Sequence, residues 1–521
     1  MHRCFLVPEI VDLICYQIQN GDGSPSEWLE ALARLARTCQ AVHEPALNYL
    51  WRELRSLMPL VKCMPADLLK VTQGRFPRVE LVRPIVPSDW PRFKENARRV
   101  RTFGLGYGVG ELTMETYQAL SMAAGGQALL PNIQELVWNF SAASFPYIHL
   151  LTGSNITTFS LSNPALIPYI STMSLLTSMN TRYPGLTHLS LTDFREEVEV
   201  AAISSAVCGW NHFRYLKVGA LSNDALVHIA ALPSLSHLHL QYRAVDRSHI
   251  KYPLSRNSCA FPAVRTMIIS SPDFSFCTDL LRSMSPGSSL KNINFSTTKF
   301  VPSTSMEWTN VIQALHDICD HSALEHLSLR DNEEDLDQFE DQYPNVVGPK
   351  HLKPLLAFSR LTSISLRANG GFDLDDPMVN DMAVAWPRLT NLRVSSDFAP
   401  SPRATISALT SLAQHCPRIM TLTMAFNAEP ASIPTPTSSP RVSNTQLKSL
   451  NVENSPISHA PSVAAFLSDI FPKIATVFVN ENDNIDEETE LEKAWGEVQN
   501  LLWVFASVRD HETSRRLRML Q

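Results

Sequence analysis

The sequence predicts an α/β repeat protein, in which short parallel strands alternate with returning helices after a small helical segment. Three observations lead to this prediction: a recurring strand-like pattern, Pro residues just before many of its copies, and helix-like stretches between copies. Hydrophobic residues make up 44% of the 521 residues and charged residues 18%, which is the composition of a folded chain.

The strand-like pattern is apolar-x-x-apolar-x-apolar, and it occurs fourteen times. Alternating apolar residues predict a strand with one buried face. The mean spacing between copies is about 29 residues, at the upper edge of the range for leucine-rich repeats. The copies begin at Val100, Ile133, Ile156, Leu186, Phe213, Leu235, Val264, Leu290, Leu324, Leu361, Leu389, Ile419, Leu447 and Ile474.

The segments between these copies carry signals for helices that end at a Pro. Several copies follow an aromatic residue, Cys or Leu and then Pro, as in YPGLTHL and CPRIMTL. Pro at that place ends a helix and starts an extended segment. Helix-like stretches precede it, for example Thr405–Cys416 and Pro461–Phe471. Each repeat therefore reads as a strand, a loop and a helix, and neighbouring repeats must stack to share a core.

This arrangement resembles a leucine-rich-repeat horseshoe, with parallel inner strands and outer helices, over residues 96–480 in about 14 repeats. The asparagine that many such repeats carry after the strand is mostly absent. An ordinary parallel α/β sheet is the alternative. Residues 481–521 are expected to form a helix that caps the last repeat. Its apolar residues at helical spacing are Trp495, Val498, Leu502, Phe505 and Val508.

The first sixty residues predict three short helices. The stretch VPEIVDLICYQI, Val7–Ile18, predicts a helix that starts at Pro8 and is apolar on more of its surface than one-sided burial needs. Ile10, Leu13, Ile14 and Ile18 form a stripe that Val11 and Cys15 widen. Two further helical patterns run over 29–39 and 47–54, the latter with Pro45 near its start.

The order of these helices resembles an F-box over residues 1–58, followed by a linker over 59–95. The resemblance lies in LVPEIVDLI near the start, LARTC at Leu35–Cys39 and LWREL at Leu50–Leu54. The chain departs from the family pattern at Val7, where Pro is usual, and at Gln40 and Val42. The stretch HEPALNYLWREL and then PSDWPRFKENARRVRTFGL resembles the linker of fungal F-box proteins that have repeat-like C-terminal regions.

The resemblance implies that the first helices bind the SKP-type adaptor of a cullin–RING ubiquitin ligase. A few large apolar anchors usually dominate such an interface, and Trp51 is the expected one. The alternative is that these helices only cap the N-terminal end of the repeats. The residues that the resemblance places on the adaptor-facing surface are Leu6, Val7, Pro8, Ile10, Val11, Ile14, Leu35, Cys39, Leu50 and Trp51.

A segment between the F-box-like helices and the second repeat copy is expected to dock on the first repeat. It reads PSDWPRFKENARRVRTFGL. The residues expected to be buried there are Trp90, Phe93, Ala97, Val100 and Phe103.

The residues between the apolar positions of each strand are expected to face the inner, concave surface. That surface is the predicted substrate-binding site. Its candidate residues are His188, Tyr215, Lys217, His237, His239, His326, Arg330, Arg367 and Arg393.

The three arginines of this set lie on successive strand copies, about 4.8 Å apart from strand to strand. Guanidinium groups bind carboxylates and phosphates well, so we expect them to receive an acidic or phosphorylated segment of a protein substrate. The alternative is that nearby acids, such as Asp331, Glu333 or Asp373, neutralise them.

The sequence contains no nucleotide-binding, catalytic or zinc-binding motif, so no catalytic residue, metal or cofactor is expected. His237 and His239 share a strand face, but two ligands rarely hold zinc. A net charge of −7 argues against a nucleic-acid partner. The nine scattered cysteines fit buried thiols in a reducing compartment. No apolar run approaches the roughly 18 residues needed to span a bilayer, and the N-terminus lacks a signal-peptide core, so no membrane contact is expected and the expected compartment is cytoplasm or nucleus.

The resemblance to an F-box followed by leucine-rich repeats implies a non-catalytic substrate-recognition subunit of an SCF-type (SKP–cullin–F-box) E3 ubiquitin ligase. The F-box would bind the adaptor, and the repeats would bind a protein substrate. One alternative is a leucine-rich-repeat interaction scaffold outside ubiquitination. Another is a GTPase-activating or other enzyme on the same frame, which only the architecture would support.

Overall fold

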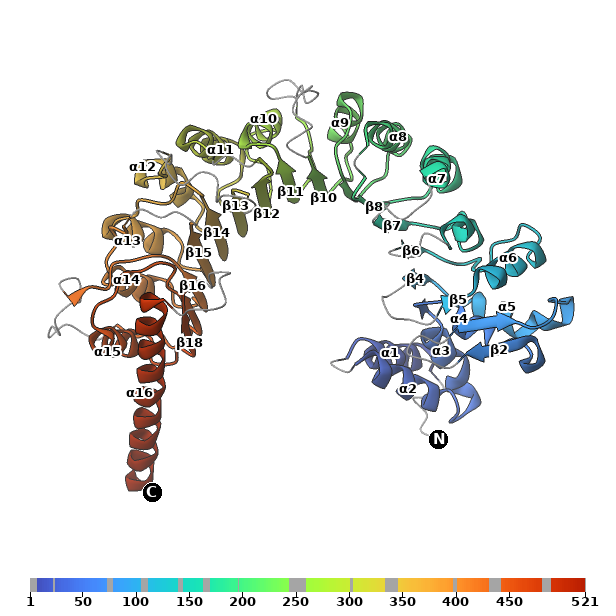
Figure 1. The fold of residues 1–521 in the computed structure, drawn as a ribbon, viewed down its shortest axis with the longest axis horizontal. Coiled ribbons are helices and arrows are strands. Elements are labelled where there is room, and N and C mark those ends of the chain that lie inside the picture. The colour runs from blue at the N-terminus through green and yellow to red at the C-terminus, as the bar shows by residue number, and fades with distance from the viewer. Residues whose placement is uncertain are drawn as a thin grey trace. The chain divides into compact units, whose positions relative to one another are not determined.

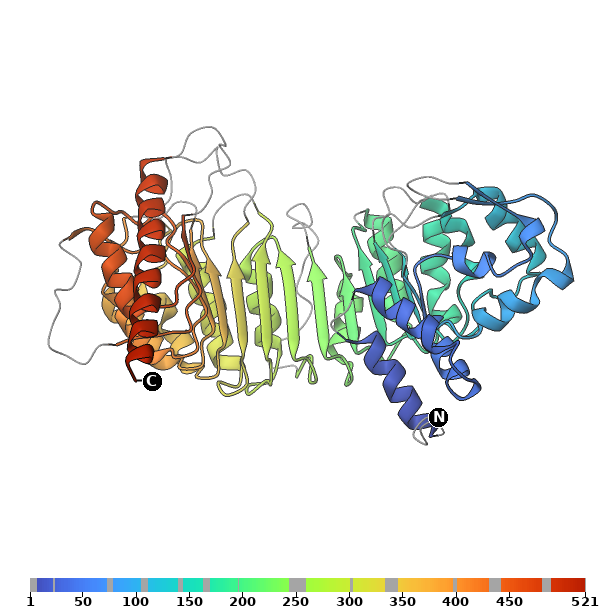
Figure 2. The ribbon, with the colours of Figure 1, turned by 90° about the horizontal axis from the view of Figure 1, so that it is seen from below.

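The computed structural model describes residues 7–21, 24–72, 78–104, 111–138, 144–162, 169–194, 196–242, 259–299, 303–332, 345–396, 401–430, 442–479 and 489–520. The chain forms two compact units, an N-terminal unit of Met1–Ser234 and a C-terminal unit of Leu235–Gln521. Within each unit parallel strands form one layer, and helices cover one face of that layer (Figure 1, Figure 2). Each unit is therefore an α/β repeat solenoid, as the sequence predicts.

The N-terminal unit begins with three packed helices, α1 (Pro8–Gln19), α2 (Pro25–Leu35) and α3 (Gln40–Leu50). Pro8 occupies the first helical position, as predicted, and at the start of α2 the Ser24 N–H donates a hydrogen bond to the Glu27 carboxylate at 2.7 Å. The third helix begins earlier than expected, so that Pro45 lies inside it. The bundle core consists of Val11, Cys15, Leu32, Ala36, Val42, Ala46 and Tyr49.

The parallel sheet of this unit has a strand that was not predicted. Leu54, expected to extend the third helix, lies in strand β1 (Glu53–Leu54), which pairs with β4. The repeat sheet thus starts inside the segment assigned to the F-box. The other strands of this sheet, in spatial order, are β4 (Thr102–Gly104), β6 (Glu135–Trp138), β7 (Thr158–Ser162), β8 (His188–Thr192) and β9 (Tyr215–Val218). Its helices are α6 (Met114–Ala123), α7 (Tyr169–Arg182), α8 (Glu197–Val207) and α9 (Asn223–Ala230), with η4 (Phe145–Leu150).

The segment 59–95, predicted to be a linker, is folded. A small sheet of order β2–β3–β5 contains antiparallel and parallel pairs, and Arg83 bridges Asp67 and Asp89, each at 2.8 Å. All five residues expected to dock this region, from Trp90 to Phe103, are buried. The elements are α4 (Met58–Val61), η2 (Ala66–Leu68), β2 (Leu69–Thr72), β3 (Arg78–Leu81), η3 (Pro87–Asp89), α5 (Pro91–Ala97) and β5 (Glu111–Leu112).

The C-terminal unit continues the same alternation of strand and helix. Its parallel strands are β10 (His237–Gln241), β11 (Thr266–Ser271), β12 (Asn292–Thr297), β13 (His326–Arg330), β14 (Ser363–Arg367), β15 (Asn391–Ser395), β16 (Thr421–Thr423), β17 (Ser449–Asn451) and β18 (Thr476–Phe478). Its helices are α10 (Phe274–Ser283), α11 (Ser305–Ile318), α12 (Pro349–Leu352), η8 (Lys353–Ala357), α13 (Asp376–Ala385), α14 (Ala408–His415), α15 (Ala460–Ile470) and α16 (Glu490–Leu520).

All fourteen copies of the six-residue pattern form strands, which confirms the repeat prediction. The alternation is visible in β13, where Leu327 and Leu329 are buried and Ser328 between them is only partly covered. The helices expected at 405–416 and 461–471 are α14 and α15. Cys416 caps α14 and Phe471 caps α15, and each is followed by a Pro, which cannot continue the helical hydrogen bonds.

The cysteines follow the prediction of buried thiols only in part. Cys15, Cys277, Cys319 and Cys416 are buried, whereas Cys208 and Cys259 are exposed. Burial raises the pKa of the Cys277 thiol to about 12, so this thiol stays protonated and unreactive.

The last helix, α16, packs against α15 and the edge strand β18. Trp495, Val498 and Leu502 are buried as predicted, but Val508 is 53% exposed. Gln499 accepts a hydrogen bond from the Val477 N–H and donates one to the Ala475 carbonyl at 3.1 Å. The helix therefore satisfies backbone groups that an uncovered edge strand would leave open.

Candidate functional site

Helix α1 carries large apolar side chains that the described chain does not cover. Ile10 is 39% exposed, Leu13 57% and Tyr16 49%, and Val7, just before the helix, is 40% exposed. We call these four residues the α1 face. They lie beside the buried side of the helix, where Val11 and Cys15 enter the bundle core. The unusually wide apolar stripe of the sequence thus divides into a buried part and an exposed part.

The residues predicted to bind an adaptor fall into three groups. Val7, Pro8 and Ile10 are exposed, and Ile14 and Trp51 are partly covered. Leu35, Cys39 and Leu50 are also partly covered and pack against the bundle core. The assignment of Val11 is corrected, because only 1% of its surface is exposed and it belongs to that core. Leu6 lies outside the described residues.

Leu13 and Tyr16 are members of the α1 face that the sequence-based list missed. The sequence places Leu13 on the apolar stripe, but the spacing of the apolar residues does not indicate which side of the stripe is buried. Val7, Ile10, Leu13 and Tyr16 are each three residues apart, and this spacing is the sequence signal that places Tyr16 on the same side of the helix.

The predicted substrate-binding residues are divided between the two units. His188, Tyr215 and Lys217 lie on β8 and β9 of the N-terminal unit, where His188 and Tyr215 are register partners with stacked rings 6.1 Å apart. The other six lie on β10, β13, β14 and β15 of the C-terminal unit. All nine alternate with buried residues, so they lie on the sheet face that the helices leave uncovered, which we call the helix-free face.

The helix-free face of the C-terminal unit is polar and carries positive charge. His237 and His239 alternate along β10 as predicted, and His326 lies on β13. None of the strands β10–β18, all within the described residues, contains an aspartate or a glutamate. Neighbouring side chains are hydrogen-bonded across strands, for example Asn391 to Thr421 at 2.6 Å.

Three arginines of this face, Arg330, Arg367 and Arg393, form a contiguous group that we call the arginine cluster. Arg330 and Arg367 are direct register partners on β13 and β14. Arg393 is offset by one row, but its Nε donates to the Ser395 hydroxyl at 3.2 Å, and Ser395 is the register partner of Arg367. Like charges directly opposite each other repel. An anion placed against this cluster would relieve that repulsion.

Two of the acids considered as neutralising partners are engaged elsewhere. Asp331 is 3% exposed, and its carboxylate accepts a hydrogen bond from the Asn369 N–H at 3.1 Å. Burial raises the pKa of Asp331. Asp373 forms an ion pair with Arg403 at 2.7 Å. The third acid, Glu333, lies outside the described residues.

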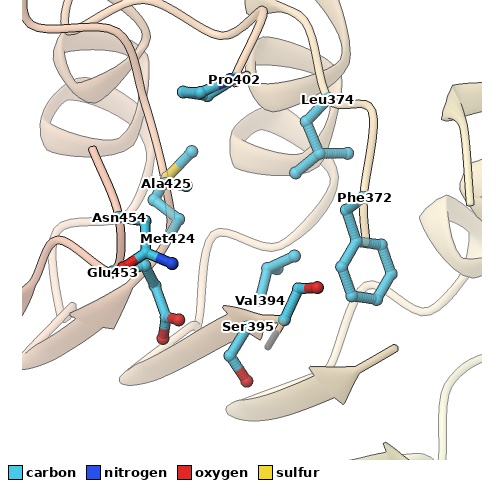
Figure 3. A pocket seen from close by; sticks show the side chains of 10 residues that line it. Phe372, Leu374, Val394, Ser395, Pro402, Met424, Ala425, Glu453 and Asn454 are labelled. Carbon is cyan, nitrogen blue, oxygen red and sulfur yellow. The ribbon is translucent and has the colours of Figure 1, made fainter. Parts of the chain in front are cut away.

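The C-terminal unit also contains a small cavity beyond the ends of β15–β17 (Figure 3). Apolar side chains such as Phe372, Leu374 and Val394 point into it, together with Ser395. Its volume of about 30 Å³ suits a single water molecule and excludes a small-molecule ligand.

The described residues contain no group of three or more His, Cys, Asp or Glu residues placed to hold a metal ion. None of the helices in the described ranges is long and apolar enough to cross a membrane.

No protein-family model matches the chain, and the search of curated proteins found no relative. Among solved structures, the Rad7 and Elc1 complex of yeast aligns at 11% identity with a TM-score of 0.32, covering 93% of this chain and 91% of that chain. The internalin InlF of Listeria monocytogenes aligns at 13% identity with a TM-score of 0.31, covering 88% and 95%. The leucine-rich repeat-containing protein LegL7 of Legionella pneumophila aligns at 12% identity with a TM-score of 0.25, covering 70% and 96%. Values this low transfer neither partner nor activity to this chain.

Proposed function

We propose that this protein is a non-catalytic substrate receptor of an SCF-type ubiquitin ligase, acting in the cytoplasm or nucleus. In this proposal the three-helix bundle is an F-box that binds an SKP-type adaptor, and through it a cullin–RING ligase. The repeat units bind a protein substrate and raise its effective concentration near the ubiquitin-charged enzyme.

The α1 face is the observation that carries this proposal. Its four apolar side chains are 39–57% exposed on a bundle whose other large apolar residues are mostly covered. Burying the exposed halves of Val7, Ile10 and Leu13 would contribute about 2–4 kcal/mol to binding. A partner that covers this face therefore gains a large part of its affinity from one helix, as expected for interface anchors.

The helix-free face supports the second half of the proposal. Polar side chains that already pair across strands can remain exposed to water in the free protein, and they offer many hydrogen-bonding groups to a partner. The arginine cluster adds positive charge without an acidic residue on the same strands. We therefore infer that the substrate presents an acidic or phosphorylated segment.

The direct test is binding of the full-length chain to a purified SKP-type adaptor, measured by isothermal titration calorimetry. We expect the double variant Ile10→Asp, Leu13→Asp to weaken binding by at least about a hundredfold, because two charges replace buried apolar contacts. The matched control is Val198→Asp on α8 of the same unit, where Val198 is 56% exposed. The control should bind like the original chain.

Three outcomes separate the proposal from its alternatives. Absence of adaptor binding by the unmodified chain, or equal binding by the double variant and the control, contradicts the F-box assignment. Adaptor binding followed by cullin recruitment supports the ligase subunit. Adaptor binding without cullin recruitment favours the interaction scaffold outside ubiquitination.

A further inference from the structure

A cleft in the N-terminal unit lies where the helical bundle meets α5 and the start of the repeat sheet. Its volume is about 340 Å³, within the range of small-molecule sites. Four arginines line it: Arg52 after α3, Arg98 and Arg99 at the end of α5, and Arg101 just before β4. This concentration of positive charge is independent of the α1 face and of the arginine cluster.

The two carboxylates in the lining of this cleft are already engaged. Glu44 of α3 pairs with Arg99, with 2.7 Å between Oε2 and Nη2. The Arg99 side chain is 2% exposed, and its Nε has no hydrogen-bond partner among the described residues. Asp12 of α1 accepts a hydrogen bond from the Tyr49 hydroxyl. Each of these two acids thus already has a partner in the cleft.

Backbone contacts hold those three arginines next to one another. The Arg101 N–H donates to the Arg52 carbonyl at 2.8 Å, and Arg101 Nη1 donates to the Arg98 carbonyl at 2.7 Å. Asn132 donates to the same Arg98 carbonyl at 2.8 Å, which brings an amide to the cleft. The Arg52 guanidinium lies over the Tyr49 ring, 5.8 Å from its centroid. None of Arg52, Arg98 and Arg101 forms an ion pair with a described residue.

We propose that this cleft binds the phosphate group of a small soluble ligand. Four arginines and two carboxylates leave an excess of two positive charges, which matches a phosphate dianion. Guanidinium groups present paired N–H donors that fit phosphate oxygens. A bound dianion also relieves the repulsion among neighbouring arginines and joins the bundle to the first repeat strands.

A second cleft lies beside the first, and in this proposal it accommodates the uncharged part of such a ligand. It has a volume of about 420 Å³ and shares Arg101 and Asn132 with the first. Apart from Arg101 its lining is neutral, with side chains such as Gln134, Asn155 and Thr157. These groups can hydrogen-bond to hydroxyls of a phosphate ester.

The test is isothermal titration calorimetry of the full-length chain with inorganic phosphate and with glucose 6-phosphate, at pH 7.5 and constant ionic strength. We expect saturable binding that Arg52→Gln and Arg98→Gln each weaken about tenfold, because each removes a charge-assisted contact. The matched control is Arg92→Gln, an exposed arginine of α5 outside the cleft, which should bind like the original chain. Thermal unfolding of each variant verifies that it is folded.

Comparison of the two probes distinguishes free phosphate from a phosphate ester as the ligand. Equal affinity for both probes assigns free phosphate, and tighter binding of the ester assigns a role to the second cleft. Binding of the ester should weaken at pH 5, where the phosphate becomes a monoanion. Lack of saturable binding, or an effect of Arg92→Gln equal to that of Arg98→Gln, overturns the proposal.

Discussion

The α1 face and the helix-free face of the C-terminal unit are both uncovered in the described chain, but their chemistry is opposite. The α1 face consists of four large apolar or aromatic side chains. The helix-free face consists mainly of serine, threonine, asparagine, histidine and arginine, with Ile268 and Phe478 as apolar exceptions, and pairs such as Ser270 and Ser296 are hydrogen-bonded at 2.8 Å. An exposed polar face costs little in water, whereas an exposed apolar face gains free energy when a partner covers it.

The apolar α1 face and the polar helix-free face would therefore recognise partners in different ways. The α1 face offers non-directional burial from one rigid helix, which suits a constant partner. The sheet face offers directional hydrogen bonds and charge spread over many strands, which suits discrimination among partners.

The largest expected effect separates the buried and exposed sides of α1. Val11→Asp places a carboxylate in the bundle core and should lower the free energy of unfolding by more than about 3 kcal/mol. Leu13→Asp, on the 57% exposed Leu13, should change it by less than about 0.5 kcal/mol. Chemical denaturation followed by circular dichroism measures both. Comparable losses in the two variants would show that the α1 face is not a solvent-exposed surface.

The second effect compares the two faces of strand β13. Leu329→Ala removes a fully buried side chain and should cost about 2–5 kcal/mol of stability. Arg330→Ala, one residue further and on the opposite face, should cost less than about 0.5 kcal/mol. Denaturant unfolding of the two variants provides the comparison. A large loss from Arg330→Ala would mean that the helix-free face is part of the folded core.

The third effect concerns the arginine cluster. Replacing Arg330, Arg367 and Arg393 with Ala should weaken binding of an oligoglutamate peptide about tenfold or more at low salt. The binding of the original chain should fall as salt rises, because exposed charges are screened.

A matched triple variant tests whether position or charge alone matters. Arg388, Arg418 and Lys473 each follow a Pro in the turn before a strand, and all three are exposed. Their replacement with Ala removes the same number of positive charges outside the helix-free face. Equal weakening by the two triple variants, measured by fluorescence anisotropy, would argue against a specific site.

The smallest expected effect concerns Asp331, which directly follows Arg330. Because burial raises its pKa, protonation of Asp331 stabilises the folded state. That contribution is complete below the pKa of an unfolded aspartate and is lost as pH rises through the folded value. Compared with the original chain, the Asp331→Asn variant should therefore have an unfolding midpoint that is raised more at pH 8 than at pH 4.

Peptide binding by Asp331→Asn tests whether Asp331 neutralises the arginine cluster. Its buried carboxylate contacts backbone and hydroxyl groups at the end of the strand, so it should contribute little to the arginine cluster. The variant should bind oligoglutamate like the original chain. Markedly tighter binding would show that Asp331 neutralises the cluster.

Much of the repeat architecture was predictable because its signal is local. The apolar positions within each six-residue copy predict which residues are buried, and a Pro before the copy predicts where the preceding helix ends. The short strand β1 was missed because two residues, Glu53 and Leu54, carry no readable period. The small sheet formed by β2, β3 and β5 was missed for the same reason, since its strands are four residues or fewer.

The candidate surfaces were predictable only in outline. Alternation placed Arg330, Arg367 and Arg393 on one sheet face, but the offset of Arg393 depends on strand register, which a single strand does not encode. The arginine-lined cleft was not predicted, because Arg52 and Arg101 are far apart in the sequence and meet only through the β1–β4 pairing.

The amino-acid order alone settled the place of the fourteen strands that carry the six-residue pattern, since burial that alternates every second residue follows from backbone geometry within each segment. The folded chain decided which side of α1 stays open, how the arginines align and where the clefts form. Those outcomes depend on contacts between distant segments, and the free energy of such contacts is defined only once the segments have packed together.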